Sequence, residues 1–161
     1  MCRLFGLTAG ITRVRATFWL LDAPDSLEVQ SHSNFDGSGI GFFDSACGTV
    51  IDKQPEPAFR DQEFIHEAKQ AESSAFVAHV RLASVGGRTV RNTHPFAMHG
   101  RIMAHNGGFG ELSRLDEQLG RRVQPVCAMS SASFSDGFIY PRVLRGRLFR
   151  LRANPASSSA V

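Results

Sequence analysis

The stretch SAFVAHVRLAS, residues 74–84, restricts the fold more than any other part of the sequence. Its side chains fall into two alternating sets, with Phe76, Ala78, Val80 and Leu82 in one and Val77, His79 and Arg81 in the other. Because successive side chains of a β-strand point to opposite faces of a sheet, this pattern predicts a strand with one apolar face. The second face then carries Arg81 beside His79 near the end of the strand.

The other segments predict short strands and helices around this strand. The strongest helix covers residues 60–71, where Asp61 can cap the first turn and apolar residues recur every three or four positions. In chain order the predictions are a strand over 2–10, helical pieces over 14–33 divided by Pro24, a hairpin of strands 38–44 and 47–54, the helix, the strand 74–84, and a strand from Gly100 that runs into a glycine turn and the start of a helix. This order lacks a regular strand-helix-strand alternation, so we expect an α+β sandwich rather than a doubly wound sheet.

Composition sets limits on the class of protein. A chain of 161 residues suits one domain, and its 42% hydrophobic and 20% charged residues exclude general disorder. Its three cysteines, at positions 2, 47 and 127, form no CxxC pair, which argues against a disulfide framework or a zinc knuckle and favours a reducing cytosol. No segment resembles a signal peptide or a membrane span, so we expect a cytoplasmic protein without a membrane partner.

Charge divides the chain at residue 120. Residues 1–120 hold 11 Lys and Arg against 14 Asp and Glu, whereas residues 121–161 hold seven Arg against Asp136 alone. We therefore expect a domain over 1–120 and an arginine-rich, disordered tail over 121–161. The basic tail raises nucleic acid as a partner, but its arginines lack both regular helical spacing and aromatic interleaving, so nucleic acid is not expected.

Cys2 directly follows the initiator methionine. If that methionine is removed, Cys2 carries a thiol and a free α-amine on one carbon, so that a nucleophile and a base share one residue. Free thiols and α-amines in general titrate close to the pH of the cytosol. The alternative is that Cys2 is an ordinary small residue at the start of a strand, which is the commoner fate of a lone cysteine.

Five motifs occur in one order along the chain: MC at 1–2, NFDGSGIGFF at 34–43, HVRLAS at 79–84, NTHPF at 92–96 and AHNGG at 104–108. In this set and order the sequence resembles a class II glutamine amidotransferase domain, a member of the N-terminal nucleophile hydrolases, over residues 1–119. The resemblance implies an αββα sandwich of stacked antiparallel sheets. It also implies glutamine amide hydrolysis or amidotransfer, with glutamine or another γ-glutamyl compound as the substrate and no cofactor.

The resemblance implies a role for each candidate site residue. Cys2 attacks the side-chain amide of glutamine, forms a γ-glutamyl thioester and releases ammonia, while its own amine transfers the proton. Arg81 binds the α-carboxylate of the substrate, and Ser84 helps to hold the same end. Asn106 and Gly107 donate N–H groups to the oxyanion. Plainer alternatives stay open, namely an arginine that reaches water, a turn serine and an Asn-Gly hairpin turn.

His94 and Asp36 lie in two of these motifs, and we expect structural or supporting roles for both. His94 belongs to the N-x-H-P loop beside the pocket, and Asp36 belongs to the turn that shapes the floor of the site. A metal site at His94, His99 and His105 is not expected, because their spacing matches no known ligand pair.

The sequence departs from the family after residue 119. The family continues with a G-D-T-D-S-E type loop, whose aspartate binds the α-amino group of the substrate. This loop is missing here, and the neighbours of Asp136 do not match it. We therefore expect a sandwich that is incomplete at its C-terminus because the sequence is truncated or altered, for instance by a change of reading frame.

Three hypotheses follow from the sequence. The leading one is a glutamine-hydrolysing enzyme that passes ammonia to an acceptor on a separate protein. The second is an inactive, truncated relative that acts as a binding or regulatory module. The third and weakest is a nucleic-acid-binding protein that uses the basic tail.

Overall fold

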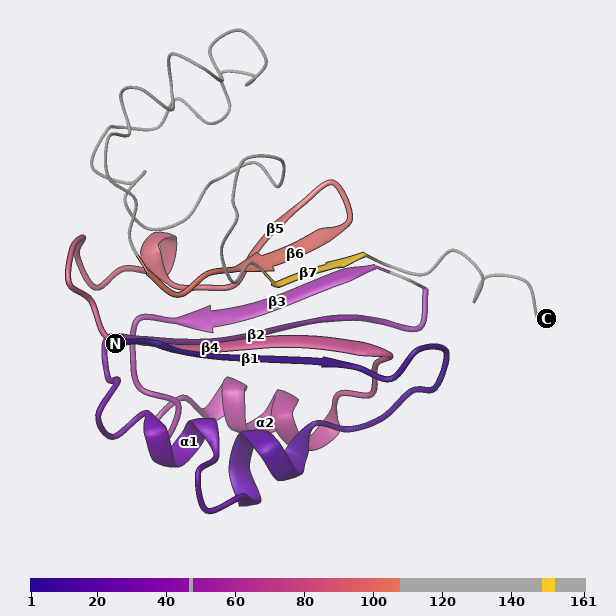
Figure 1. The fold of residues 1–161 in the computed structure, drawn as a ribbon, viewed down its shortest axis with the longest axis horizontal. Helices are drawn as coiled ribbons and strands as arrows, with labels where there is room; N and C mark the ends of the chain where they lie inside the picture. The colour runs from indigo at the N-terminus through magenta and orange to yellow at the C-terminus, as the bar shows by residue number, and fades with distance from the viewer. Residues whose placement is uncertain (47, 108–148, 153–161) are drawn as a thin grey trace, which may run out of the picture.

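The computed structural model describes residues 1–46, 48–107 and 149–152. A layer of helices, a four-stranded sheet and a three-stranded sheet lie in that order, and both sheets are antiparallel (Figure 1). In chain order the elements are β1 (Arg3–Thr8), η1 (Phe18–Asp22), α1 (Leu27–Gln30), β2 (Gly37–Phe43), β3 (Thr49–Gln54), α2 (Gln62–Gln70), β4 (Ala75–Arg81), η2 (Val90–Asn92), β5 (Phe96–Met98), β6 (Arg101–Ala104) and β7 (Phe149–Arg152).

The four-stranded sheet has the order β1-β4-β2-β3. Strands β2 and β4 lie at its centre, and every residue of both strands is buried. In the register, His79 of β4 pairs with Leu4 of β1 on one side and with Gly39 of β2 on the other. The sheet therefore joins the start of the chain directly to the end of β4.

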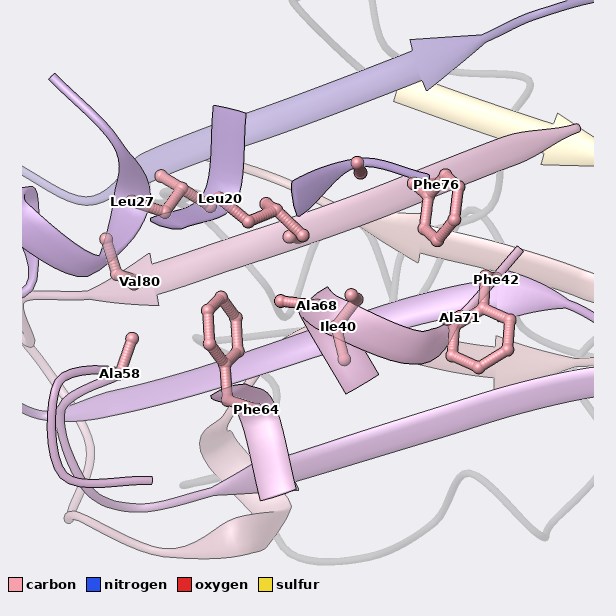
Figure 2. Packing of buried hydrophobic residues seen from close by; sticks show 12 residues of the cluster. Leu20, Leu27, Ile40, Phe42, Ala58, Phe64, Ala68, Ala71, Phe76 and Val80 are labelled. Atoms are coloured by element: carbon pink, nitrogen blue, oxygen red, sulfur yellow. The ribbon is translucent and has the colours of Figure 1, made fainter. Parts of the chain in front are cut away.

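One face of this sheet packs against the helices. Side chains of β2 and β4 meet Leu20 of η1, Leu27 of α1 and Phe64 of α2 in one apolar core (Figure 2). The sheet contributes Ile40, Phe42, Phe76, Ala78 and Val80. The predicted apolar face of the strand 74–84 is therefore confirmed from Phe76 to Val80, whereas Leu82 lies just past the end of β4.

The opposite face packs against the three-stranded sheet, whose order is β5-β6-β7. A second core joins Ile102 and Ala104 of β6 to Val77 of β4 and Phe43 of β2. Alternate residues of β2 on this face are glycines, and the space beside them is filled. A Cβ on Gly41 would lie 2.9 Å from Ile102 Cγ2, so the second sheet packs directly on the backbone of β2.

The helices begin and end for local reasons. Asp61 caps α2, because its Oδ1 accepts a hydrogen bond from the Phe64 N–H at 3.1 Å, as the sequence predicted. Ser26 caps α1 by accepting from the Val29 N–H at 3.3 Å. Pro24 separates η1 from α1, so the prediction of short helical pieces is confirmed.

The α+β fold and the β2–β3 hairpin are confirmed. Strand β5 was not predicted. The second helical layer of an αββα sandwich stays a prediction, as does the domain boundary at residue 120. Within the tail, residues Phe149–Arg152 form strand β7 beside β6.

Several expectations lie outside the described residues. They concern Cys47, Cys127, Asp136 and the helix start after Gly107. Among the described helices, each is too short or too polar to cross a membrane.

Candidate functional site

Cys2 lies directly before β1, beside the residue that follows β4. Its Sγ is 3.3 Å from the Leu82 nitrogen, which donates a hydrogen bond to it, and 3.4 Å from the Leu82 carbonyl oxygen, to which the thiol donates. The side chain is half-buried.

Met1 precedes the cysteine and is 83% exposed. The exposed Arg3 side chain donates to the Met1 carbonyl oxygen at 2.7 Å and to the Cys2 carbonyl oxygen at 3.3 Å. These bonds are local to the first three residues, and the bond to Met1 is lost when the methionine is removed.

Asn106 is brought next to Cys2 although 104 positions separate them. It follows β6, and its Nδ2 donates a hydrogen bond to the Cys2 carbonyl oxygen at 2.8 Å. Gly107 has a φ of +131°, a conformation that side-chain-bearing residues rarely adopt. The structure thus brings Cys2 and the Asn106–Gly107 corner together.

Arg81 is only 2% exposed, and its guanidinium faces the loop that follows β4. It donates to the carbonyl oxygens of Val85 at 2.9 Å and Gly87 at 3.2 Å. Ser84 lies exposed in the same loop. In this structure Arg81 therefore shapes the loop 82–89, and its role in carboxylate binding stays a prediction.

Asp36 fastens this loop to the start of β2. Its Oδ2 accepts a hydrogen bond from the Ala83 N–H at 2.8 Å, and its Oδ1 lies 3.3 Å from Nε of Arg88. The Asp36 N–H donates to the Arg81 carbonyl oxygen at 2.9 Å. These contacts support the structural role that the sequence suggested.

His94 is buried between two other imidazole rings. Its ring centroid lies 4.3 Å from that of His79 and 4.5 Å from that of His105. Burial lowers the pKa of His79 to about 3, helped by the nearby charges of His105 and Arg81, although the His105 backbone favours the charged form. Burial and the neighbouring cations also lower the pKa of His94 well below its ordinary value.

The histidine group differs from the set that the sequence suggested. His99 lies exposed in the β5–β6 turn with a φ of 50°, and His79 takes its place in the group. The signal for His79 was its position on the same strand face as Arg81. Among the residues that the structure describes, no group of three or more His, Cys, Asp or Glu side chains is placed to hold a metal ion.

The sequence did not mark Lys53 as a residue near the candidate site. Its Nζ donates to the Thr93 carbonyl oxygen at 2.8 Å and lies 4.3 Å from the centroid of the Phe96 ring. Burial lowers the pKa of Lys53 to about 8. Lys53 thus holds the N-x-H-P loop on β3, a contact for which a lone lysine in a strand gives no sequence signal.

Comparison with known proteins shows the family to which this chain belongs. Residues 1–134 match the family model of class II glutamine amidotransferases. This chain belongs to the class II glutamine amidotransferase family. The resemblance found in the motifs is confirmed, and the family match extends past residue 120 into the arginine-rich segment.

Two relatives of this amidotransferase family member have names that state a reaction. The chain is 35% identical over 117 residues to a gamma-glutamyl-hercynylcysteine sulfoxide hydrolase from Mycobacterium tuberculosis, an alignment that covers 66% of this chain and 49% of that protein. It is 30% identical over 91 residues to the probable glutamine amidotransferase DUG3 from Saccharomyces cerevisiae, covering 53% of this chain and 26% of the yeast protein. The chain therefore spans about half the length of the first relative and about a quarter of the second.

Proposed function

We propose that this protein hydrolyses the γ-amide of glutamine or of another γ-glutamyl compound through a thioester on Cys2. The observation that carries the proposal is the hydrogen bond at 2.8 Å from Asn106 Nδ2 to the Cys2 carbonyl oxygen. This bond places Cys2, whose thiol and α-amine would share one carbon, next to Asn106 and Gly107, whose N–H groups can donate to an oxyanion. The two relatives support the same reaction class, since one is named as a hydrolase of a γ-glutamyl compound and the other as a probable glutamine amidotransferase.

The proposed chemistry begins after removal of Met1. The α-amine of Cys2 accepts the thiol proton, and the thiolate attacks the amide carbon to form a tetrahedral oxyanion. Asn106 carries two N–H donors, so one can keep the Cys2 carbonyl while the other meets the oxyanion together with the Gly107 N–H. Collapse expels ammonia, or the amine of the γ-glutamyl compound, which takes the proton. Water then cleaves the thioester to release the γ-carboxylate and restore the thiol.

Arg81 and Ser84 are proposed to bind the carboxylate end of the substrate. A guanidinium can bind a carboxylate with two parallel hydrogen bonds. The contacts from Arg81 to Val85 and Gly87 would have to be exchanged for the substrate. Substrate binding is therefore expected to move the loop 82–89.

We place the reaction in the cytoplasm, where a free thiol is maintained. When glutamine is the substrate, the ammonia would be used by an acceptor on a separate protein. When another γ-glutamyl compound is the substrate, the product released is an amine rather than ammonia, so no ammonia acceptor on a second protein is needed.

The test uses the full chain after intact-mass measurement has established that Met1 is absent. Release of glutamate and of ammonia or amine is followed with glutamine and with simple γ-glutamyl amides. Cys2→Ala should abolish release, whereas Cys127→Ala should not change it, because it leaves the N-terminal residue intact. Retained Met1 in the native protein, or equal release by Cys2→Ala, would overturn the proposal.

A second candidate is an inactive family member that acts as a binding or regulatory module. Residues 120–161 do not contain the G-D-T-D-S-E type loop with which, as the resemblance implies, the family holds the α-amino group of the substrate, and this departure motivates the second candidate. Diazo-oxo-norleucine, a glutamine-like electrophile, separates the two. It should add covalently to Cys2 in the enzyme and leave the inactive module unlabelled.

A further inference from the structure

Three buried imidazole rings form a row between the two sheets, which we call the imidazole row: His79, His94 and His105. His79 lies on β4, His94 in the loop before β5, and His105 directly after β6. Their residues are 0%, 3% and 6% exposed. The row therefore crosses from the four-stranded sheet to the strand that leads to Asn106.

The two ends of the row lie at the two halves of the candidate site. His79 pairs in register with Leu4, close to the start of β1 and hence to Cys2. His105 is the residue before Asn106. The row thus links the strands that carry the thiol to the corner that carries the proposed oxyanion donors.

The middle ring is held in place from its backbone. The His94 carbonyl packs against Gly39 of β2, where a Cβ would clash with the carbonyl oxygen. Next to it, the Thr93 carbonyl accepts a hydrogen bond from Lys53 Nζ at 2.8 Å. The backbone from which the His94 ring projects is therefore fixed by β2 and β3 of the four-stranded sheet.

The ring contacts fix angles as well as distances. The His94 ring is inclined by 47° to His79 and stands edge-on to His105 at 89°. Phe96 packs on His94 with a centroid distance of 4.7 Å. A planar ring that contacts three neighbouring rings has few rotamers that satisfy all the contacts, so the orientation of the His94 ring is tightly restricted.

We propose that His94 is a positioning residue which, through the His105 ring, holds Asn106 and Gly107 at the correct distance from Cys2 for amide hydrolysis. The inference rests on the proposed function. His94 does not touch the substrate in this account. Its effect is on the oxyanion donors and not on the thiol, and this difference can be measured.

The main variant is His94→Leu, which fills the space but removes the planar ring. Hydrolysis of the γ-glutamyl amide should lose about 10- to 100-fold in kcat, because a small misplacement of catalytic donors has effects of this size. KM should change by less than about 3-fold. Alkylation of Cys2 by iodoacetamide, which needs the thiol but no oxyanion donor, should keep its wild-type rate. His94→Phe, which keeps a ring, should recover most of kcat.

Val77→Ala is the matched control, because Val77 is buried on the same strand as His79 but belongs to the neighbouring apolar core. It opens a cavity between the same two sheets and should leave kcat within about 3-fold of wild type. In the Asn106→Ala background, His94→Leu should cause no further loss if it acts through Asn106. Equal loss in Val77→Ala, or full additivity with Asn106→Ala, would overturn the inference.

A second readout does not need activity. In ¹⁵N-labelled protein, the side-chain amide resonances of Asn106 report its hydrogen bond to the Cys2 carbonyl oxygen. They should shift in His94→Leu and stay in place in Val77→Ala. If the wild-type chain proves inactive but the resonances shift as expected, the proposed function fails and the positioning role stands. Unshifted resonances in His94→Leu would overturn the positioning role itself.

Discussion

At the scale of single residues, the candidate site depends on a few polar contacts that cross large sequence distances. The Leu82 amide meets the Cys2 sulfur, and the Asp36 carboxylate meets the next amide, that of Ala83. The backbone that faces the thiol is thus fixed by a carboxylate from the start of β2. Removing this carboxylate should affect both stability and the thiol.

We therefore predict that Asp36→Ala destabilises the fold. A buried hydrogen bond to a charged group contributes roughly 1.5–3 kcal/mol, and the Ala83 N–H would lose its acceptor. The loss should appear in urea unfolding, together with a changed rate of Cys2 modification by a disulfide reagent. Arg88→Ala is the control, because it removes a half-exposed ion pair with Asp36 and an exposed hydrogen bond to the Phe35 carbonyl oxygen but leaves the Asp36 carboxylate on the Ala83 N–H. It should cost less than about 1 kcal/mol. Equal losses in the two variants would contradict the assignment.

Replacing Asp52 should raise the stability of the fold, whereas replacing Asp36 should lower it. Burial, together with the negative charges of Asp61, Glu63 and Glu67, raises the pKa of Asp52 to about 6. Its charged form is therefore disfavoured in the folded state at neutral pH, and Asp52→Asn should stabilise the protein at pH 7. We expect at most about 1 kcal/mol, because the partly exposed carboxylate is screened by water. The gain should shrink as the pH falls from about 6 and disappear below about pH 4, where Asp52 is protonated in both the folded and the unfolded chain. A gain that persists below pH 4 would exclude this cause.

At the scale of elements, β2 determines how closely the second layer approaches. Its alternate glycines face the N-x-H-P loop and β6. A Cβ on Gly37 would lie 2.8 Å from Thr93 Oγ1, and one on Gly39 would lie 2.7 Å from Lys53 Cβ and clash with the His94 carbonyl. The motif DGSGIG is therefore a packing surface as much as a turn.

We predict that Gly39→Ala destabilises the protein by about 3 kcal/mol, because the clash is with backbone and cannot be relieved by a change of rotamer. The loop of His94 would be displaced, so kcat should fall as well. Gly87→Ala is the matched control, since the nearest atom to its added Cβ is Thr89 Cγ2 at 3.9 Å. Its stability should stay within about 0.5 kcal/mol of wild type by chemical denaturation. A small loss of stability in Gly39→Ala, similar to that of Gly87→Ala, would show that the layers can separate freely.

Elements with strong local signals could be predicted from the sequence. The alternation along 74–84 gave β4 and its apolar face, and Asp61 capped the predicted helix. Strand β5 has only three residues and exists through its pairing with β6, so no local pattern marks it. Two contacts depend on the stacking of the two sheets. They are the hydrogen bond from Lys53 to the Thr93 carbonyl oxygen and the contact of His79 with the other rings of the imidazole row. Such contacts between layers have no signature in a single segment.

At the scale of the whole molecule, burial of neutral imidazoles between the layers makes stability depend on pH. The pKa of His79 falls to about 3 and that of His94 is also lowered, both chiefly by burial. In the unfolded chain a histidine titrates near pH ~6.5. Below that pH the unfolded state binds protons that the folded state does not. Folding stability is therefore fully present above about pH 6.5 and declines as the pH falls towards 3.

The expected slope for His79 is about 1.4 kcal/mol per pH unit, and His94 acts in the same direction. Asp52 opposes it, because its raised pKa stabilises the fold as the pH falls from about 6 towards 4. The histidines should prevail, since they are buried more completely than this carboxylate. Urea unfolding at pH 8, 7, 6 and 5 should show constant stability down to pH 7 and a decline below it. His94→Phe should flatten that decline, because it removes one buried titrating group while it keeps the ring contacts. Stability that rises from pH 7 to pH 5 in Asp52→Asn, which lacks the opposing carboxylate, would mean that the imidazoles accept protons in the folded state, and the packing between the layers would then have to admit water.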